Sequence, residues 1–146
     1  MEMIALSIKQ PWANLIADGK KRIEVRSWRT RPQRDIVLCS SRIPRIDPAG
    51  FAICLCDIID CQPMEPGDQR FALVPWRPGA FAWTLNNIRR IPLFPIIGRL
   101  SFFSIDIPRD LTHTIKPLLH RFPSPGRNIR IPRRAALALE ESDRSL

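Results

Sequence analysis

The segment from Gly19 to Trp28, GKKRIEVRSW, contains the residues best suited to chemistry. Its single carboxylate, Glu24, lies between Arg22 and Arg26, and neighbouring positive charges favour the ionised form of a carboxyl group. Such a group can act as a general base on water, or it can accept hydrogen bonds from the exocyclic amine of a nucleic-acid base. A solvated strand face with ordinary ion pairs would show the same spacing, so both interpretations stay open.

Four tryptophans could supply flat faces on which bases stack, with arginines nearby. They are Trp12, Trp28, Trp76 and Trp83. The alternative is that these rings fill a small core or cover its ends. Trp76 stands in the stretch Pro75-Trp76-Arg77-Pro78, and the two prolines predict an exposed loop there.

Ser40, Ser41 and Arg42 follow a short apolar run. Hydroxyl groups and an arginine at a strand end are suited to contacting a phosphate. An ordinary turn would use the same residue types. We therefore treat Ser40 and Arg42 as candidate binding residues.

The composition bounds the class of protein. At 146 residues the chain is long enough for one domain, and it carries a formal net charge of +9. Arginine outnumbers lysine by 19 to 4, which favours a polyanionic partner, although a GC-rich genome would produce the same bias. The sequence shows no apolar run of membrane-spanning length and no secretory signal, which predicts a cytoplasmic protein without a membrane span.

The cysteines point away from a metal site. In the absence of a secretory signal, we expect reduced thiols at Cys39, Cys54, Cys56 and Cys61. The spacing of Cys54 and Cys56 is too short for a zinc knuckle, and on a strand the two side chains would pack on one face. The two histidines have no neighbouring ligand pattern. We expect neither a metal nor a cofactor.

The elements that must position Glu24 begin with a strand over 3–8 and a helix near residues 11 to 18. Pro11 suits the first helical position, and Gly19 suits the left-handed position that ends a helix. A strand over 20–28 would direct Ile23 and Val25 to one side and Glu24 and Arg26 to the other. We expect the long Lys21 side chain to swing towards the same cleft, and we expect the loss of a cleft charge to cost little stability.

Further strands are predicted over 36–39, 51–60, 80–85, 88–97 and 98–107. Pro92 and Pro95 place the 88–97 strand at an edge or a bulge. Five to seven short strands and one helix predict an α+β, mainly β fold that closes or half-closes into a small barrel. Residues 1–107 would form this domain. Residues 108–146 would form a basic, proline-rich extension that adds electrostatic affinity, with a short helix over 134–141.

The run LSIKQPWA from Leu6 to Ala13, the run Gly19-Lys20-Lys21 and the run EVRSW from Glu24 to Trp28 together resemble the ASCH domain family. The run FAWTL from Phe81 to Leu85 resembles a later strand of that family. The resemblance covers about residues 3–107. It implies a PUA-like β-barrel with a cleft beside the first helix that binds RNA or a nucleoside.

On this basis the leading hypothesis is an RNA- or modified-nucleoside-binding protein. Phosphates would contact Lys20, Lys21, Arg26 and Arg42, a base would stack on Trp12 or Trp83, and Glu24 would favour cytosine or adenine through an amino group. The full set of candidate binding residues is Trp12, Lys20, Lys21, Glu24, Arg26, Trp28, Ser40, Arg42 and Trp83.

Two alternatives remain. Some small ASCH proteins resemble amidohydrolases that act on N4-acetylcytidine with a lysine and a threonine on this strand and a glutamate from elsewhere. Lys21 matches the lysine, and Glu24 replaces the threonine without supplying a hydroxyl group, so Lys21 and Glu24 would be the catalytic pair of such an enzyme. The other alternative is an adaptor domain whose basic face binds an acidic protein.

Overall fold

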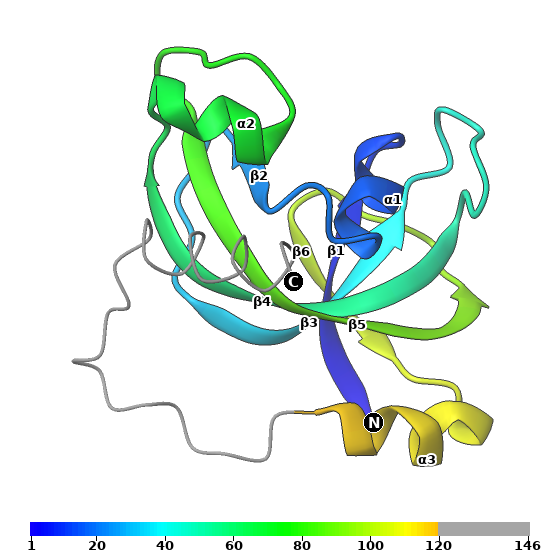
Figure 1. The fold of residues 1–146 in the computed structure, drawn as a ribbon. Coiled ribbons are helices and arrows are strands. Elements are labelled where there is room, and N and C mark those ends of the chain that lie inside the picture. Colours follow the sequence, from blue (N-terminus) through cyan, green and yellow to red (C-terminus); the bar gives the residue numbers. More distant parts are fainter. Residues whose placement is uncertain (120–146) are drawn as a thin grey trace, which may run out of the picture.

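The computed structural model describes residues 1–119, in which six strands form a single curved sheet (Figure 1). The strand order is β2-β5-β4-β3-β1-β6. β1 pairs in parallel with β3, and the other pairings are antiparallel. The strands are β1 (Glu2–Ile8), β2 (Ile23–Arg26), β3 (Gln33–Ser40), β4 (Phe51–Pro63), β5 (Phe81–Pro95) and β6 (Phe102–Asp106).

The prediction of a mainly β fold is confirmed, but the sheet does not close into a barrel. Within residues 1–119, β2 and β6 are edge strands that do not pair with each other. β4 and β5 are long, and register shifts between them bend the sheet strongly. β2 has four residues, all paired with the first part of β5, and it does not reach β6. An open seam therefore remains between the two edges.

Several predicted boundaries change for local reasons. The strand expected over 20–28 shortens to β2, because residues 20–22 turn out of α1 before the chain extends. The strands expected over 80–85 and 88–97 are one strand, β5. Pro92 and Pro95 fall where only β4 pairs with β5, which confirms the predicted edge position. Residues 98–101 form a loop instead of the start of a strand.

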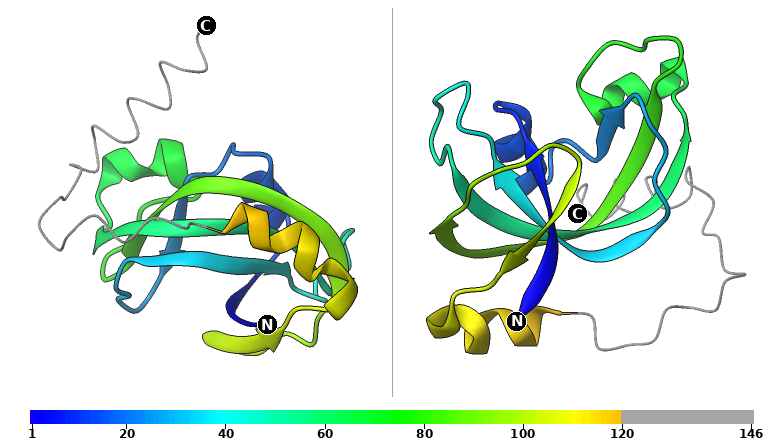
Figure 2. Two further views of the ribbon diagram at one scale, coloured as in Figure 1. Left: turned by 90° about the horizontal axis from the view of Figure 1, so that it is seen from below. Right: turned by 180° about the vertical axis from the view of Figure 1, so that it is seen from behind.

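The helix α1 (Trp12–Ala17) confirms the prediction around residues 11 to 18. Pro11 precedes its first turn, and Gly19 follows with a φ of 73°. Ala13, Ile16 and Ala17 are buried against the sheet, on the side that we call the inner face. Two short helices, α2 (Gln69–Ala72) and α3 (Thr112–Ile115), and the 3-10 turns η1 (Pro66–Asp68), η2 (Arg109–Leu111) and η3 (Lys116–Leu118) complete the described elements (Figure 2).

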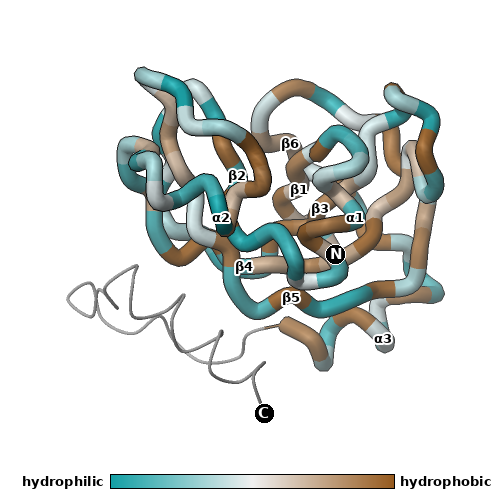
Figure 3. The backbone as a smooth tube through the Cα atoms, turned by 45° about the horizontal axis from the view of Figure 1, so that its top comes forward, coloured by the Kyte–Doolittle hydropathy of each residue, from teal (hydrophilic) through white to brown (hydrophobic). Residues whose placement is uncertain are grey.

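Apolar side chains cover both faces of the sheet, because buried strands alternate their side chains between the two sides. On β3, Ile36 and Leu38 pack under α1, whereas Val37 and Cys39 face the opposite side. Figure 3 shows the apolar stretches running along the central strands and the polar ones on the outer loops. On β4, Cys54 and Cys56 both belong to the apolar cluster under α1, so they pack on one face of the sheet, as their spacing predicted.

The outer face is covered by residues 108–119, which lie beneath the sheet in Figure 1. Ile115 of α3 is fully buried there with Phe103 and Ile105 of β6. The folded unit therefore continues past residue 107. The rest of the predicted extension, 120–146, including the expected helix over 134–141, lies outside the described residues.

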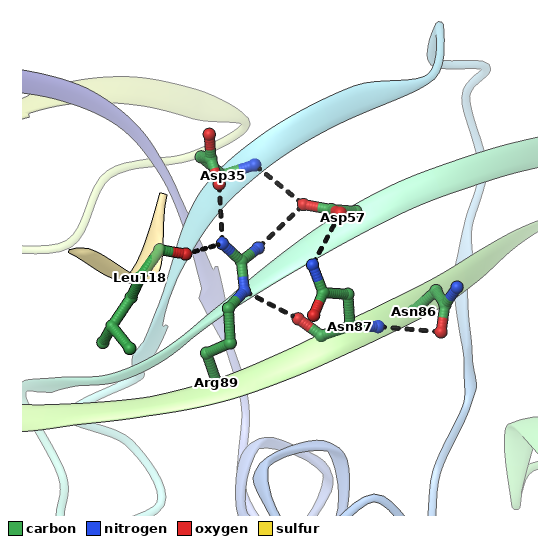
Figure 4. A network of polar contacts seen from close by, with 6 residues as sticks. All are labelled: Asp35, Asp57, Asn86, Asn87, Arg89 and Leu118. Carbon is green, nitrogen blue, oxygen red and sulfur yellow. Dashed lines mark hydrogen bonds and ion pairs between the residues drawn. The ribbon is translucent and has the colours of Figure 1, made fainter. Parts of the chain in front are cut away.

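A polar network holds this segment to the sheet (Figure 4). Arg89 donates from Nη1 to Asp35 Oδ1 at 2.7 Å and to the Leu118 carbonyl at 2.6 Å, and from Nη2 to Asp57 Oδ1 at 2.8 Å. Asp57 also accepts a hydrogen bond from Asn87. The side chains of Arg89 and Asp57 are mostly buried, so these charges stabilise each other away from water. The network ties the end of η3 to β3, β4 and β5.

Across residues 1–119, no helix combines the length and apolar character needed to cross a membrane.

We predict that Ile115→Ala lowers the free energy of unfolding by about 2–5 kcal/mol, because it leaves a cavity between α3 and the sheet. Urea unfolding followed by tryptophan fluorescence measures the change. His113→Ala, at an exposed position of the same helix, is the control and should change stability little. An unchanged midpoint for Ile115→Ala would show that this segment contributes nothing to the folded unit.

Candidate functional site

A cavity of about 890 Å³ opens at the seam between β2 and the β1–β6 side of the sheet. Its volume lies within the ~300–1,000 Å³ typical of ligand sites. Its walls are residues 7–9, 24–26, 39–43 and 96–101, together with Trp12, Gly50 and Arg77. The cavity therefore joins the ends of β1 and β3, most of β2 and three loops, which follow β3, α2 and β5.

Glu24 is the carboxylate of this cavity, and its side chain is held from two sides. Arg26 Nη2 lies 3.1 Å from Glu24 Oε2, and the backbone N–H of Val25 donates to Oε1 at 3.1 Å. Lys21 Nζ lies 4.0 Å from Oε1. Arg26 also donates to the Ser7 carbonyl at 3.0 Å, which links β2 to β1 across the seam. The sequence prediction that Glu24 and Arg26 share the face opposite Ile23 and Val25 is confirmed.

Lys21 does not swing into the cleft as expected. It is 2 % exposed, and its ammonium group donates to the Ala72 carbonyl at the end of α2. The cause is local: the N–H groups of Lys20 and Lys21 both bond to the Leu15 carbonyl, so the chain turns under α2 before β2 begins. Burial lowers the pKa of Lys21; the nearby Glu24 opposes this effect and Arg26 adds to it.

Two of the candidate aromatic residues lie in the core of the seam. Trp83 has no exposed surface, and its ring stacks on Phe102 with centroids 5.7 Å apart. Trp28 is half-buried, contacts Trp83 edge-on at 4.6 Å, and accepts a hydrogen bond from the Trp83 indole at its carbonyl. Neither ring lines the cavity, so in this structure neither is placed to stack a base. Trp76 is 42 % exposed, which confirms the predicted loop position.

The structure brings Trp12, Glu24, Arg26, Ser40 and Arg42 together around one cavity. Ser40 is buried, and its hydroxyl accepts a hydrogen bond from Gln10 at 3.0 Å. Lys20 is exposed and stands outside the cavity walls. Of the three candidate phosphate-binding residues on the predicted 20–28 strand, Lys20, Lys21 and Arg26, only Arg26 lines the cavity.

Comparison with known proteins identifies the family. The ASCH domain profile matches residues 6–93, which is more than half of the chain. This chain belongs to the ASCH domain family. A search of curated protein sequences gave no match.

Solved structures agree with this assignment at the level of fold. The crystal structure of the ASCH protein from Zymomonas mobilis is 15% identical, has a TM-score of 0.57, and covers 80% of this chain and 95% of its own. A single-residue variant of that protein gives the same identity, with a TM-score of 0.57 and 98% of its own chain covered. The resemblance inferred from the N-terminal motifs is therefore confirmed.

Four cavity residues of this ASCH domain were not identified from the sequence as candidate binding residues. They are Ser7, Lys9, Arg77 and Arg99. Residues 96–101 reach the cavity because Gly98 lies against β1: a Cβ atom there would stand 2.5 Å from Ser7 Oγ. A lone glycine before an arginine does not reveal such a contact, which depends on how the β5–β6 loop folds back.

Charged and hydroxyl-bearing side chains are prominent among the described residues that line the cavity. Within residues 1–119, no group of three histidine, cysteine or acidic side chains is placed to hold a metal ion. All four cysteines are free thiols, and burial raises the pKa of both Cys39 and Cys54 to about 12. Such thiols are poor nucleophiles, because the thiolate is the reactive form.

The lowered pKa of Lys21 predicts a pH-dependent stability. Between the folded pKa and the unfolded value of 10.5, the unfolded chain binds more protons, so the Lys21 contribution makes folding more favourable as the pH rises. The free energy of unfolding of the wild type, minus that of Lys21→Met, should therefore rise with pH in this alkaline range. Urea unfolding at stepped pH measures this difference. The buried cysteines contribute equally to both proteins, so their contribution cancels. The control is Lys20→Met at the exposed neighbouring position, for which the difference from the wild type should not change with pH. A difference for Lys21→Met that is independent of pH would contradict the effect of burial on the Lys21 pKa.

Proposed function

We propose that this ASCH domain binds single-stranded RNA and places one base in the cavity beside Glu24. The observation that carries the proposal is the charge arrangement of the walls. Among the described residues that line the cavity, Glu24 is the single carboxylate, and the other charged residues are cations. These cations are Lys9, Arg26, Arg42, Arg77 and Arg99.

The inner part of the cavity suits a base that carries an amino group. Glu24 is fixed by Arg26 and by the N–H of Val25, so its orientation is set before a ligand arrives. A fixed carboxylate accepts from the exocyclic amine of cytosine or adenine and repels the carbonyl oxygen of uracil. The half-buried Trp12 also lines the cavity and supplies an aromatic ring there. Cytosine and adenine are therefore the proposed bases.

The outer part of the cavity suits the nucleic-acid backbone. Its cationic residues attract phosphate groups and release counterions on binding, which makes affinity fall with salt. Lys20 and Lys21, which the sequence had suggested for this role, are replaced by residues on the loops. The net charge of +9 acts in the same direction over the whole chain.

A second candidate function is hydrolysis of an acylated cytidine. The observation in its favour is Lys21 Nζ, which lies 4.0 Å from Glu24 Oε1 and has a pKa lowered by burial. In such a reaction Glu24 would take a proton from water, and Lys21 would position Glu24 from behind because it does not line the cavity. Release of cytidine from N4-acetylcytidine measures this activity.

We predict that Glu24→Gln weakens binding of an oligocytidine by roughly 10- to 100-fold, because it removes a charged hydrogen-bond acceptor. Fluorescence anisotropy, normalised to the folded fraction, measures the binding. Normalisation is needed because Glu24 is 7 % exposed and paired with Arg26. The sequence alone predicted a small cost for the loss of an exposed charge, but removal of a buried, paired charge also lowers stability.

The control is Asp110→Asn, which removes an exposed carboxylate from the opposite face and should leave the affinity unchanged. The wild type should bind oligouridine more weakly than oligocytidine. Glu24→Gln should bind the two oligonucleotides with equal affinity. Binding of oligocytidine that is identical in both proteins would refute the role of Glu24. If N4-acetylcytidine is turned over and Glu24→Gln abolishes turnover while binding falls less, the hydrolase is the correct function.

A further inference from the structure

Resting on the proposed function, we propose that the mouth of the cavity is a phosphomonoester site formed by Arg42, Arg77 and Arg99. The ligand would then be a phosphorylated nucleotide, either free or at the end of an RNA strand, and not an unphosphorylated nucleoside. The base would occupy the inner part of the cavity at Glu24.

The first observation is that three loops each send one arginine to the same cavity. Arg42 follows β3, Arg77 lies between α2 and β5, and Arg99 lies between β5 and β6. Residues so far apart in sequence converge because the strand ends meet at the seam.

The second observation is that these arginines have no acidic partner within residues 1–119, whereas other arginines of the fold do. Arg26 pairs with Glu24, Arg89 with Asp35 and Asp57, and Arg90 with Asp18. Glu24, the only carboxylate that the described part of the chain contributes to the cavity walls, is already held by Arg26. The three guanidinium groups therefore leave a local excess of positive charge that an anion would neutralise.

The third observation is that two of the arginines are positioned by close backbone contacts. The stem of Arg42 lies over Gly50, where a Cβ atom would stand 3.4 Å from Arg42 Cγ and 3.7 Å from Nε. Arg99 directly follows Gly98, whose contact with Ser7 fixes how near the loop comes to β1. These contacts hold the stem of Arg42 and the loop that carries Arg99 beside the cavity without a bound ligand.

The fourth observation is an unused hydroxyl group. Ser7 Oγ is buried in the cavity wall and has no hydrogen-bond partner in the described structure. A buried hydroxyl without a partner is unfavourable, and a ligand oxygen would supply the partner. Together with the three arginines, this hydroxyl adds a fourth hydrogen-bond donor at the cavity, and donors are the groups that bind phosphate oxygens.

Charge decides between a phosphomonoester and the internal diester of a strand. A diester carries one negative charge, whereas a monoester carries nearly two and presents three terminal oxygens. Guanidinium groups bind such oxygens in pairs, so three arginines from different loops match a terminal phosphate better than a bridging one.

The test compares phosphorylated and unphosphorylated ligands of the full chain by calorimetry. CMP should bind at least about tenfold more tightly than cytidine, because charged hydrogen bonds are added. Oligocytidines with a 5′-phosphate, a 3′-phosphate or hydroxyl ends then distinguish a strand end from a free nucleotide. Equal affinity for the phosphorylated and unphosphorylated forms would overturn the proposal.

Variants separate this proposal from the proposed function. Arg42→Gln, Arg77→Gln and Arg99→Gln should each reduce the preference for CMP over cytidine, and Arg109→Gln, on the opposite face, should retain it. Glu24→Gln should weaken CMP and cytidine alike and keep the preference. If CMP is preferred but Glu24→Gln changes nothing, the phosphate site stands and base recognition fails. If binding requires Glu24 but ignores the phosphate or the three arginines, base recognition stands and the phosphate site is wrong.

Discussion

The contact on which the site depends is the one that Arg26 makes across the open seam. One guanidinium nitrogen donates both to Glu24 beside it and to the Ser7 carbonyl of β1. Because β2 and β6 do not pair, this side-chain contact, together with the packing of Trp28 on Phe102, connects the two edges of the sheet. The cavity exists because side chains, and not a strand ladder, bridge the seam. Replacing them with hydrogen-bonded strands would fill the space that a ligand needs.

The same seam explains why one basic segment yields such different environments. The chain leaves α1 in a tight turn, so Lys20 remains in solvent and Lys21 is drawn beneath α2. Only after this turn does regular alternation begin, and it delivers Glu24 and Arg26 to the cavity. Burial of an ammonium group is unfavourable unless it is hydrogen-bonded, and the Ala72 carbonyl meets that requirement. Lys21 thereby links α2 to the strand that carries Glu24.

Local patterns in the sequence predicted most of the elements but not their assembly. The positions of Pro11 and Gly19 at the two ends of α1 could be predicted, because the backbone preferences of proline and glycine act over only a few residues. The alternation of side chains around Glu24 is equally local. Whether the sheet closes depends on the bulges between β4 and β5, which side-chain pattern does not report. The burial of Ile115 and the arrival of Arg77 and Arg99 at the cavity depend on contacts between segments distant in sequence. The resemblance to ASCH domains identified the strand of Glu24 but gave no information on the loops.

Because β2 is shorter than β5, part of β5 is an exposed sheet edge, which affects the tendency of separate molecules to associate. β2 pairs with Phe81–Thr84 alone, so the later part of β5 has no strand partner within residues 1–119 on the side that faces away from β4. Such an edge invites a second chain to add to the sheet and start a growing aggregate. Pro92 and Pro95 lack the N–H groups that an added strand would need, and the charged Arg90 lies on the same stretch. Pro92 and Pro95 therefore also oppose the addition of a second chain to this edge at high protein concentration.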